Sequence, residues 1–276
     1  MTTKYKQILV VHDLAFLHFP KFIARQHLLY YKWFTGNFIR KAKRVVTVST
    51  FSENDIKTKY PAANNKTDVV FSAAKESFHP IPYTRQQQVK VQYAEGCEYF
   101  LFVGGIHPRK NLMQLLKAFS LFKKWQKSNM KLLVAGRLAW KYGNLLEKLE
   151  TYKHRKDVIM LDYLEETELA DITGAAYALV FPSYFEGFGV PIIEAMQCEV
   201  PVITSDVSSM PEIGGDAVLY CDPDNADSIA KQMMQLYKDE NLRTSLIEKG
   251  KLQAAKFSWD YTADLFWESI EKAVNS

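Results

Sequence analysis

The sequence lacks a long apolar run, since no stretch approaches the roughly 18 residues needed to span a bilayer. Its polar start, Met1 to Lys6, leads into only a short apolar segment, which predicts neither a signal peptide nor an anchor. It has only three cysteines, Cys97, Cys198 and Cys221, and none has CxxC spacing. Neither a disulfide framework nor a zinc site is indicated. We therefore expect a cytoplasmic protein in a reducing compartment.

Acidic residues are missing between Asp13 and Glu53. The first 60 residues hold eleven Lys and Arg against three Asp and Glu, whereas the 276-residue chain has a net charge of only +4. Within the segment 21–44, cations alternate with aromatic residues. Such a segment could contact anionic lipid at the inner face of the membrane or a phosphate-bearing substrate. The alternative is a surface helix with a solvated basic face and an aromatic core face. We expect no nucleic-acid partner.

The composition is that of a globular protein, with 47% apolar and 24% charged residues, and it excludes disordered and fibrous classes. Short apolar runs, polar turns and helical periods recur along the chain, which predicts an α/β fold with parallel sheets. The expected strands of a first block are Ile8–Val11, Val45–Val48 and Val69–Phe71. Those of a second block are Tyr99–Val103, Lys131–Ala135, Val158–Leu161, Ala178–Phe181, Pro201–Thr204 and Ala217–Tyr220. The expected helices include 22–42, a short one that starts with a Thr50/Glu53 capping box, 111–127, 142–153, 226–238, 240–255 and 259–273.

Four segments follow from this pattern. Six strands with helical crossovers predict a complete, doubly wound Rossmann-like domain over 98–256. Three strands cannot form an open sheet covered on both faces, so the pattern predicts a partial Rossmann-like domain over 1–80. The polar, proline-containing residues 81–97 are expected to be a linker. The helical segment in 257–276 is expected to pack back on the first domain.

The sequence after Val103 lacks both the G-x-G-x-x-G pattern and a Walker A loop, which disfavours a nicotinamide enzyme. It has instead the diglycine Gly104-Gly105, followed by Arg109 and Lys110 at an expected helix start. Arg as a bidentate donor and Lys as a point charge suit a diphosphate. A glycine turn with two exposed cations is the alternative interpretation.

Two carboxylates flank the glycine-rich loop after the fourth strand of the second block, Glu186 and Glu194. Gly187 and Gly189 allow the backbone to approach a ligand, and the proline that follows suits a first helical turn. Carboxylates accept hydrogen bonds from sugar hydroxyls but repel a bare phosphate. The pattern therefore indicates a ligand with a hydroxylated part. For Glu194, stabilisation at a helix N-terminus is the plain alternative.

The stretch from Glu186 to Glu194 resembles the E-x7-E motif of glycosyltransferase family 4, a family of retaining enzymes with the GT-B fold of two facing Rossmann-like domains. Relative to a typical member, roughly 90–120 residues of the first domain are absent by ordinary domain sizes. The resemblance is also carried by Val103-Gly104-Gly105, Arg109-Lys110-Asn111, Ala135-Gly136-Arg137, Ser183, Pro201–Ser205, Ser209-Met210-Pro211-Glu212, Phe257-Ser258-Trp259, His12-Asp13-Leu14 and Thr47–Ser52.

The resemblance implies roles for individual residues. Arg109 and Lys110 would hold the donor diphosphate, and Glu194 would bind the ribose hydroxyls. Glu186, with the amides of Phe188 and Gly189, would address the donor sugar. The implied catalytic residues are Glu186, Arg109, Lys110 and His12. The implied donor-binding residues are Gly104, Gly105, Arg137, Tyr163, Gly187, Phe188, Gly189, Val190 and Glu194.

The implied activity is transfer of a hexose, such as mannose, glucose or an N-acetylhexosamine, from a UDP- or GDP-sugar to a glycan or lipid-linked acceptor with retention of configuration. Synthesis of cell-surface polysaccharide or lipopolysaccharide is the expected setting. No cofactor and no metal are expected, because no DxD site follows a strand. Two alternatives stay open: a nucleotide-sugar-binding module that is inactive alone or needs a partner chain, and another GT-B protein such as a nucleotide-sugar epimerase.

Overall fold

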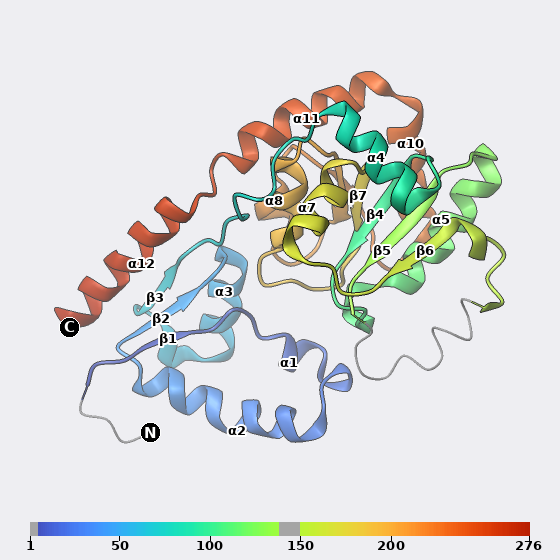
Figure 1. Ribbon diagram of the computed structural model, residues 1–276. Coiled ribbons are helices and arrows are strands. Elements are labelled where there is room, and N and C mark those ends of the chain that lie inside the picture. The colour runs from blue at the N-terminus through green and yellow to red at the C-terminus, as the bar shows by residue number, and fades with distance from the viewer. Residues whose placement is uncertain (1–4, 138–149) are drawn as a thin grey trace.

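Two parallel β-sheets organise the chain in this computed structural model, which describes residues 5–137 and 150–276 (Figure 1). The larger sheet and its helices form one layered unit, and the smaller sheet lies beside it, nearer the N-terminus of the chain. Apart from its last residues, the helix expected over 142–153 lies outside the described residues. In the ranges given above, no helix is both long and apolar enough to cross a membrane.

The larger sheet has six parallel strands in the order β6-β5-β4-β7-β8-β9. Its strands are β4 (Tyr99–Val103), β5 (Lys131–Ala135), β6 (Val158–Leu161), β7 (Ala178–Phe181), β8 (Val202–Ser205) and β9 (Leu219–Cys221). The order reverses between β4 and β7, so the loops that leave these two neighbours diverge and open a crevice at their carboxyl ends. This is the doubly wound sheet that the sequence predicts.

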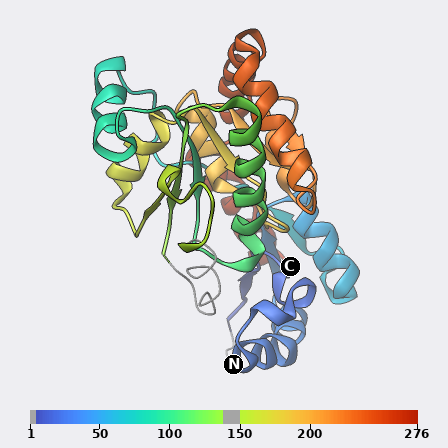
Figure 2. The same cartoon turned by 90° about the vertical axis from the view of Figure 1, so that its right-hand side faces the viewer.

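The core lies on both faces of this sheet, because its central strands are mostly apolar and every residue of β4, β5 and β7 is buried. One face packs on α4 (Tyr83–Ala94), α7 (Glu166–Gly174), α8 (Val190–Gln197), α9 (Met210–Gly214) and α11 (Glu240–Ala254). The other packs on α5 (Leu112–Gln126) and α10 (Ala226–Lys238). Figure 2 shows α4 and α7 on one side of the strands and α5 on the other, and α11 contributes Leu246 to the core on the side of α5. Short 3-10 turns cover Pro108–Lys110 and Arg155–Asp157.

The smaller sheet has three parallel strands in the order β1-β2-β3. These are β1 (Ile8–Val10), β2 (Arg44–Thr47) and β3 (Thr67–Val69). The helices of this unit are α1 (Ala15–His18), α2 (Arg25–Lys41) and α3 (Thr50–Lys59), with 3-10 turns at Pro20–Phe22 and Pro61–Ala63. A small core, with Leu14, Ile39 and Ile56 fully buried, joins them.

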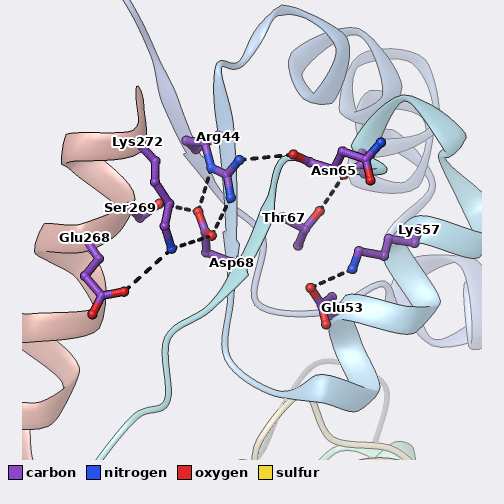
Figure 3. Close-up of polar contacts among 10 residues, drawn as sticks. Arg44, Glu53, Lys57, Asn65, Thr67, Asp68, Glu268, Ser269 and Lys272 are labelled. Carbon is purple, nitrogen blue, oxygen red and sulfur yellow. Dashed lines mark hydrogen bonds and ion pairs between the residues drawn. The ribbon is translucent and has the colours of Figure 1, made fainter. Parts of the chain in front are cut away.

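The last helix, α12 (Trp259–Val274), lies along the small sheet rather than the large one (Figure 1). The carboxylate of Asp68 on β3 fixes it there, since it accepts hydrogen bonds from Arg44 Nε at 2.7 Å and from Ser269 Oγ at 2.8 Å (Figure 3). Lys272 Nζ lies 3.4 Å from the same carboxylate. The C-terminal helix is therefore anchored to the small sheet of the N-terminal unit.

Among the helices, two local predictions differ from the structure. Helix α4 occupies most of the range expected as a linker, because the glutamines read there as polar connector are good helix formers. Helix α3 is capped by Ser49, whose Oγ accepts from the amide of Ser52 at 3.1 Å, rather than by Thr50. Ser49 keeps the extended backbone that an N-cap needs, whereas Thr50 is already helical.

Candidate active site

The loops that follow β4 and β7 meet at the point where the strand order of the larger sheet reverses. The amide of Tyr184 donates to the carbonyl of Arg109 at 2.9 Å. The side-chain amide of Asn111, in a left-handed backbone conformation, donates to the carbonyls of Pro182 and Pro223 at 2.9 and 2.7 Å. The cationic loop and the glycine-rich loop are thus fastened together.

Three of the predicted site residues form an ion cluster there. The carboxylate of Glu186 lies 2.7 Å from Lys110 Nζ and 3.1 Å from Arg109 Nη1. Arg109 also donates to the carbonyl of Phe185. Glu186 is only 7% exposed, so its charge is compensated inside the protein. Two cations against one carboxylate leave the cluster with one net positive charge, which suits an anionic ligand.

Burial alone would raise the pKa of Glu186, but the charges of Lys110 and Arg109 outweigh it and hold the pKa below its usual value. Glu186 is therefore ionised at neutral pH. Lys110 has a second contact, with its Nζ 4.8 Å from the ring centroid of Phe181. Its aliphatic stem runs beside Gly104, where an added Cβ would lie 3.4 Å from Lys110 Cε.

A cavity of about 280 Å³ opens beside this cluster. Gly104 and Gly105 line one part of it, and Arg137 and Tyr163 line another. The guanidinium carbon of Arg137 lies 4.0 Å from the centroid of the Tyr163 ring, which is a close cation–π stack. A planar cation and a half-exposed aromatic ring at the mouth of a small cavity can hold a flat, polar group.

Helix α8 and the glycine-rich loop before it bring the remaining predicted donor-binding residues to the same edge of the sheet. Gly189 is its N-cap with φ at +105°, and Val190 is its first residue. Among the described residues no side chain caps this end, so the positive end of its dipole can face an anion, although Pro191 has no N–H and the amide of Ile192 donates to the carbonyl of Gly189. The amide of Phe188 belongs to this end, but its ring packs on Phe257 at 5.7 Å.

Glu194 is the fifth residue of α8 and is half-buried. Burial raises its pKa to about 7, because the nearby charge of Lys75 only partly offsets the cost of ionisation and Glu166 adds to it. Glu194 therefore lies in a different electrostatic environment from Glu186. The two carboxylates have opposite pKa shifts, as expected of groups with different roles.

Gly187 lies against the N-terminal unit. A Cβ added to it would stand 2.5 Å from the carbonyl oxygen of His12 and 2.9 Å from Asp13 Cβ, so only glycine fits. The backbone of His12 thus touches the loop that carries Glu186. The side chain of His12 is exposed and lines a mainly apolar cavity of about 470 Å³ between β1 and α2.

Several serines that sequence reasoning left without a role hold the donor loop. Ser208 Oγ accepts from the amide of Glu186 at 3.0 Å. The single hydroxyl hydrogen of Ser209 is shared between the carbonyls of Glu186 and Phe188, which lie 2.9 and 2.8 Å from its Oγ. Ser49 Oγ donates to the carbonyl of Gly187 at 2.6 Å. The sequence signal that could have found these serines is a polar residue within a few positions of the end of an apolar strand.

In the described part of the chain, no group of three His, Cys, Asp or Glu side chains could hold a metal ion.

Two facing Rossmann-like units, with a cationic and glycine-rich site where they meet, define a protein of the GT-B fold. A model of the family described as glycosyl transferases group 1 matches residues 84–253. The chain belongs to this family, glycosyltransferase family 4, whose members are retaining enzymes.

Named relatives agree with this assignment. The chain is 31% identical over 258 residues to O-antigen chain mannosyltransferase B of Escherichia coli, a match that spans 92% of this chain and 67% of that protein. It is 26% identical to the serotype-specific mannosyltransferase WbdA of Escherichia coli over 99% of this chain, but spans only 34% of that relative. Among solved structures, Anabaena HepE in complex with UDP and glucose is 16% identical with a TM-score of 0.82, over 96% of this chain and 71% of that one. The chain is thus shorter than the relatives it matches.

Proposed function

We propose that the chain transfers a hexose from a nucleoside diphosphate sugar to a hydroxyl of a glycan or lipid-linked acceptor, with retention of configuration, in the synthesis of a surface polysaccharide. The observation that carries this proposal is the ion cluster of Arg109, Lys110 and Glu186 at the carboxyl ends of β4 and β7. It provides net positive charge for a diphosphate next to a carboxylate for sugar hydroxyls. Mannose is the first sugar to test, since relatives at 31% and 26% identity are named mannosyltransferases.

In the reaction, the bond between the anomeric carbon and the donor phosphate oxygen breaks, and a bond to the acceptor oxygen forms on the same face of the sugar. The acceptor proton passes to the departing phosphate. Arg109 and Lys110 stabilise the negative charge that grows on this leaving group, and the open N-terminus of α8 adds to their effect. Glu186 orients the sugar, Glu194 accepts from the ribose, and His12 approaches the sugar from the N-terminal unit.

We assign the nucleobase to the cavity lined by Arg137 and Tyr163. Its volume of about 280 Å³ and the 4.0 Å stack suit a planar ring more than a sugar. The base of the proposed donor is uracil or guanine. In the structure of HepE, the bound nucleotide is UDP.

Calorimetric titration with UDP, GDP and ADP, each with and without magnesium, tests the donor assignment. Saturable binding of one nucleotide in the absence of magnesium, at a stoichiometry of one, is the expected result. Lys117→Met, a charge removal on the exposed face of α5, serves as the matched control for Lys110→Met. Equal affinities in the two variants would contradict a donor site at Lys110.

A nucleotide-sugar-binding module that needs a partner chain is the second candidate. It is favoured by the cavity of about 470 Å³ beside β1, which leaves an apolar part of the small unit open. Radiolabelled sugar transfer to a lipid-linked acceptor separates the candidates. Nucleotide binding without transfer, followed by transfer when cell membranes or a partner polypeptide are added, would favour the module.

We propose that helix α2 faces the membrane that carries the acceptor. Its exposed rings, Tyr30, Trp33 and Phe34, are interleaved with cations, and the segment from Leu14 to Ser52 holds no acidic residue. Charge complementarity therefore favours anionic lipid. Co-sedimentation with phosphatidylglycerol vesicles should exceed that with phosphatidylcholine vesicles and fall at high salt. Trp33→Ala and Lys32→Gln should each weaken it, whereas equal binding to both vesicle types would contradict the proposal.

A further inference from the structure

The N-terminal unit grips the donor loop, residues 183–189, from outside the larger sheet. Ser49 Oγ and Ser52 Oγ both donate to the carbonyl of Gly187, at 2.6 and 3.2 Å. Both hydroxyls are buried, and both belong to the first turn or cap of helix α3. The peptide that follows Glu186 is therefore held by a helix of the other unit.

Aromatic packing reinforces this grip. Phe185, which directly precedes Glu186, is only 5% exposed. Its ring centroid lies 4.9 Å from that of His18 and 5.6 Å from that of Phe51, the second residue of α3. Withdrawal of α3 would thus uncover the side chain next to the site carboxylate.

One contact fastens α3 itself to the larger unit. The two carboxylate oxygens of Glu212, on helix α9, accept one hydrogen bond each from the backbone amides of Thr50 and Phe51, at 2.9 and 3.0 Å. These amides lie in the first turn of α3, where they have no intrahelical acceptor. A carboxylate there gains both charge-assisted hydrogen bonds and a favourable interaction with the helix dipole.

We propose that Glu212 is a positioning residue that acts as an interdomain latch for the donor site. Its carboxylate holds α3 against the larger unit, and Ser49 at the start of that helix then orders the peptide between Glu186 and Phe188. When Glu212 releases α3, the N-terminal unit no longer holds the donor loop. The consequence for nucleotide binding rests on the proposed function, whereas the ordering of the loop does not.

Hydrogen–deuterium exchange of the full chain tests the ordering directly. We expect Glu212→Gln to speed the exchange of amides in 50–53 and 183–189 by about tenfold, as expected for the loss of one charge-assisted hydrogen bond. Exchange in α5 should stay unchanged. Glu248→Gln removes an equal charge from the exposed face of α11 and should change neither segment. A rate at 183–189 that equals the wild type would overturn the proposal, and so would an equal acceleration in α5, which would indicate general destabilisation.

Ser49→Ala provides a second, independent variant. It removes the hydroxyl that holds Gly187 and caps α3, but leaves the Glu212 carboxylate in place. If the latch acts through Ser49, Glu212→Gln and Ser49→Ala together should speed exchange at 183–189 little more than either alone. Multiplicative effects would show that the residues act separately and would overturn the proposal.

Nucleotide affinity gives the functional readout of the same variants. Glu212→Gln should weaken binding of the nucleotide identified by calorimetry by about three- to tenfold, because loop order is partly lost before the ligand binds. Unchanged affinity, together with faster loop exchange, would overturn the role in donor binding. If the wild type binds none of UDP, GDP and ADP, the proposed function fails. The comparison of exchange rates still tests the latch in that case.

Discussion

Lys110 Nζ lies 2.7 Å from a carboxylate oxygen of Glu186, although the two residues follow different strands of the larger sheet. The pair joins the cationic loop to the glycine-rich loop across the point where strand order reverses. Because Glu186 is buried, this pair has a structural role in addition to the role we propose in donor binding. Its two roles can be separated by experiment.

Lys110→Met should weaken binding of the donor nucleotide by about tenfold or more, since one charge-assisted contact to the diphosphate is lost. It should also lower the free energy of unfolding by about 1–3 kcal/mol, because Glu186 keeps only Arg109 as a compensating charge. Adding Glu186→Gln removes the uncompensated carboxylate. The double variant should therefore regain most of the stability but none of the affinity. Calorimetry and urea denaturation measure the two quantities, and parallel recovery of both would refute the separation.

Gly187→Ala should separate the two units at the donor loop. The new methyl group would overlap the backbone carbonyl of His12, 2.5 Å away, and would lie 2.9 Å from Asp13 Cβ. We expect a loss of about 1–3 kcal/mol in stability together with weaker nucleotide binding. Gly105→Ala is the matched control for stability, because a Cβ there meets nothing within 4 Å. Similar melting temperatures for the two variants would contradict the close approach.

Glu194 should make stability depend on pH. Burial raises its pKa from an ordinary value of 4.5 to about 7 in the folded chain, so between these values the native state binds more protons than the unfolded state. Its contribution to stability is fully present below about pH 4.5 and is lost as the pH rises through about 7. Relative to Glu194→Gln, the wild type should therefore become less stable over this interval. Parallel curves of unfolding free energy against pH would contradict the shifted pKa.

Nucleotide binding should release a proton from the same residue. A ribose hydroxyl donates to the ionised carboxylate, so the bound ligand favours loss of the Glu194 proton near pH 6.5. Calorimetry in buffers of different ionisation enthalpy measures this release. Glu194→Gln is the control, since titration of the ligand phosphate is common to both proteins. The wild type should release more protons than the variant, and equal release would argue against ribose binding at Glu194.

Sequence reasoning was most accurate where local signals and tertiary structure agree. The bounds of β4, β5, β6 and β7 match the predicted runs, because each strand is a mostly apolar run followed by a glycine, a proline or a polar residue. β3 was predicted two residues too late, at Val69–Phe71 instead of Thr67–Val69. The apolar Phe71 belongs to a core contact with Phe257, at 5.6 Å, and an apolar run alone cannot separate such a contact from a strand.

The site was predictable only in part, for a physical reason. Arg109, Lys110 and Glu186 follow strands that a doubly wound order makes neighbours, so their proximity could be expected from topology. The contacts of Gly187 with His12 and of Glu212 with α3 depend on how the two units face each other. A local pattern contains no information on that arrangement, and the role of Glu212 therefore came from the structure alone.

Asp68→Asn should loosen α12 from the small sheet (Figure 3). Burial would raise the pKa of Asp68, but hydrogen bonds from Arg44 and Ser269 and the charge of Lys272 hold it below its usual value. The contribution of Asp68 to stability is therefore present above its ordinary pKa near 4 and is lost as the pH falls through the lower native value. At pH 7 we expect the variant to lose about 1–3 kcal/mol of unfolding free energy and to exchange α12 amides faster.

Glu53→Gln is the control for Asp68→Asn, because it makes the same acid-to-amide change in the same unit. Glu53 pairs with Lys57 at 2.8 Å along one turn of α3, a type of pair that contributes about 0.5 kcal/mol or less (Figure 3). The difference between the two variants should narrow as the pH falls below about 4 and through the lower native pKa of Asp68, where its carboxylate becomes protonated. Equal losses at pH 7, or a difference that persists at low pH, would show that the Asp68 carboxylate does not anchor α12.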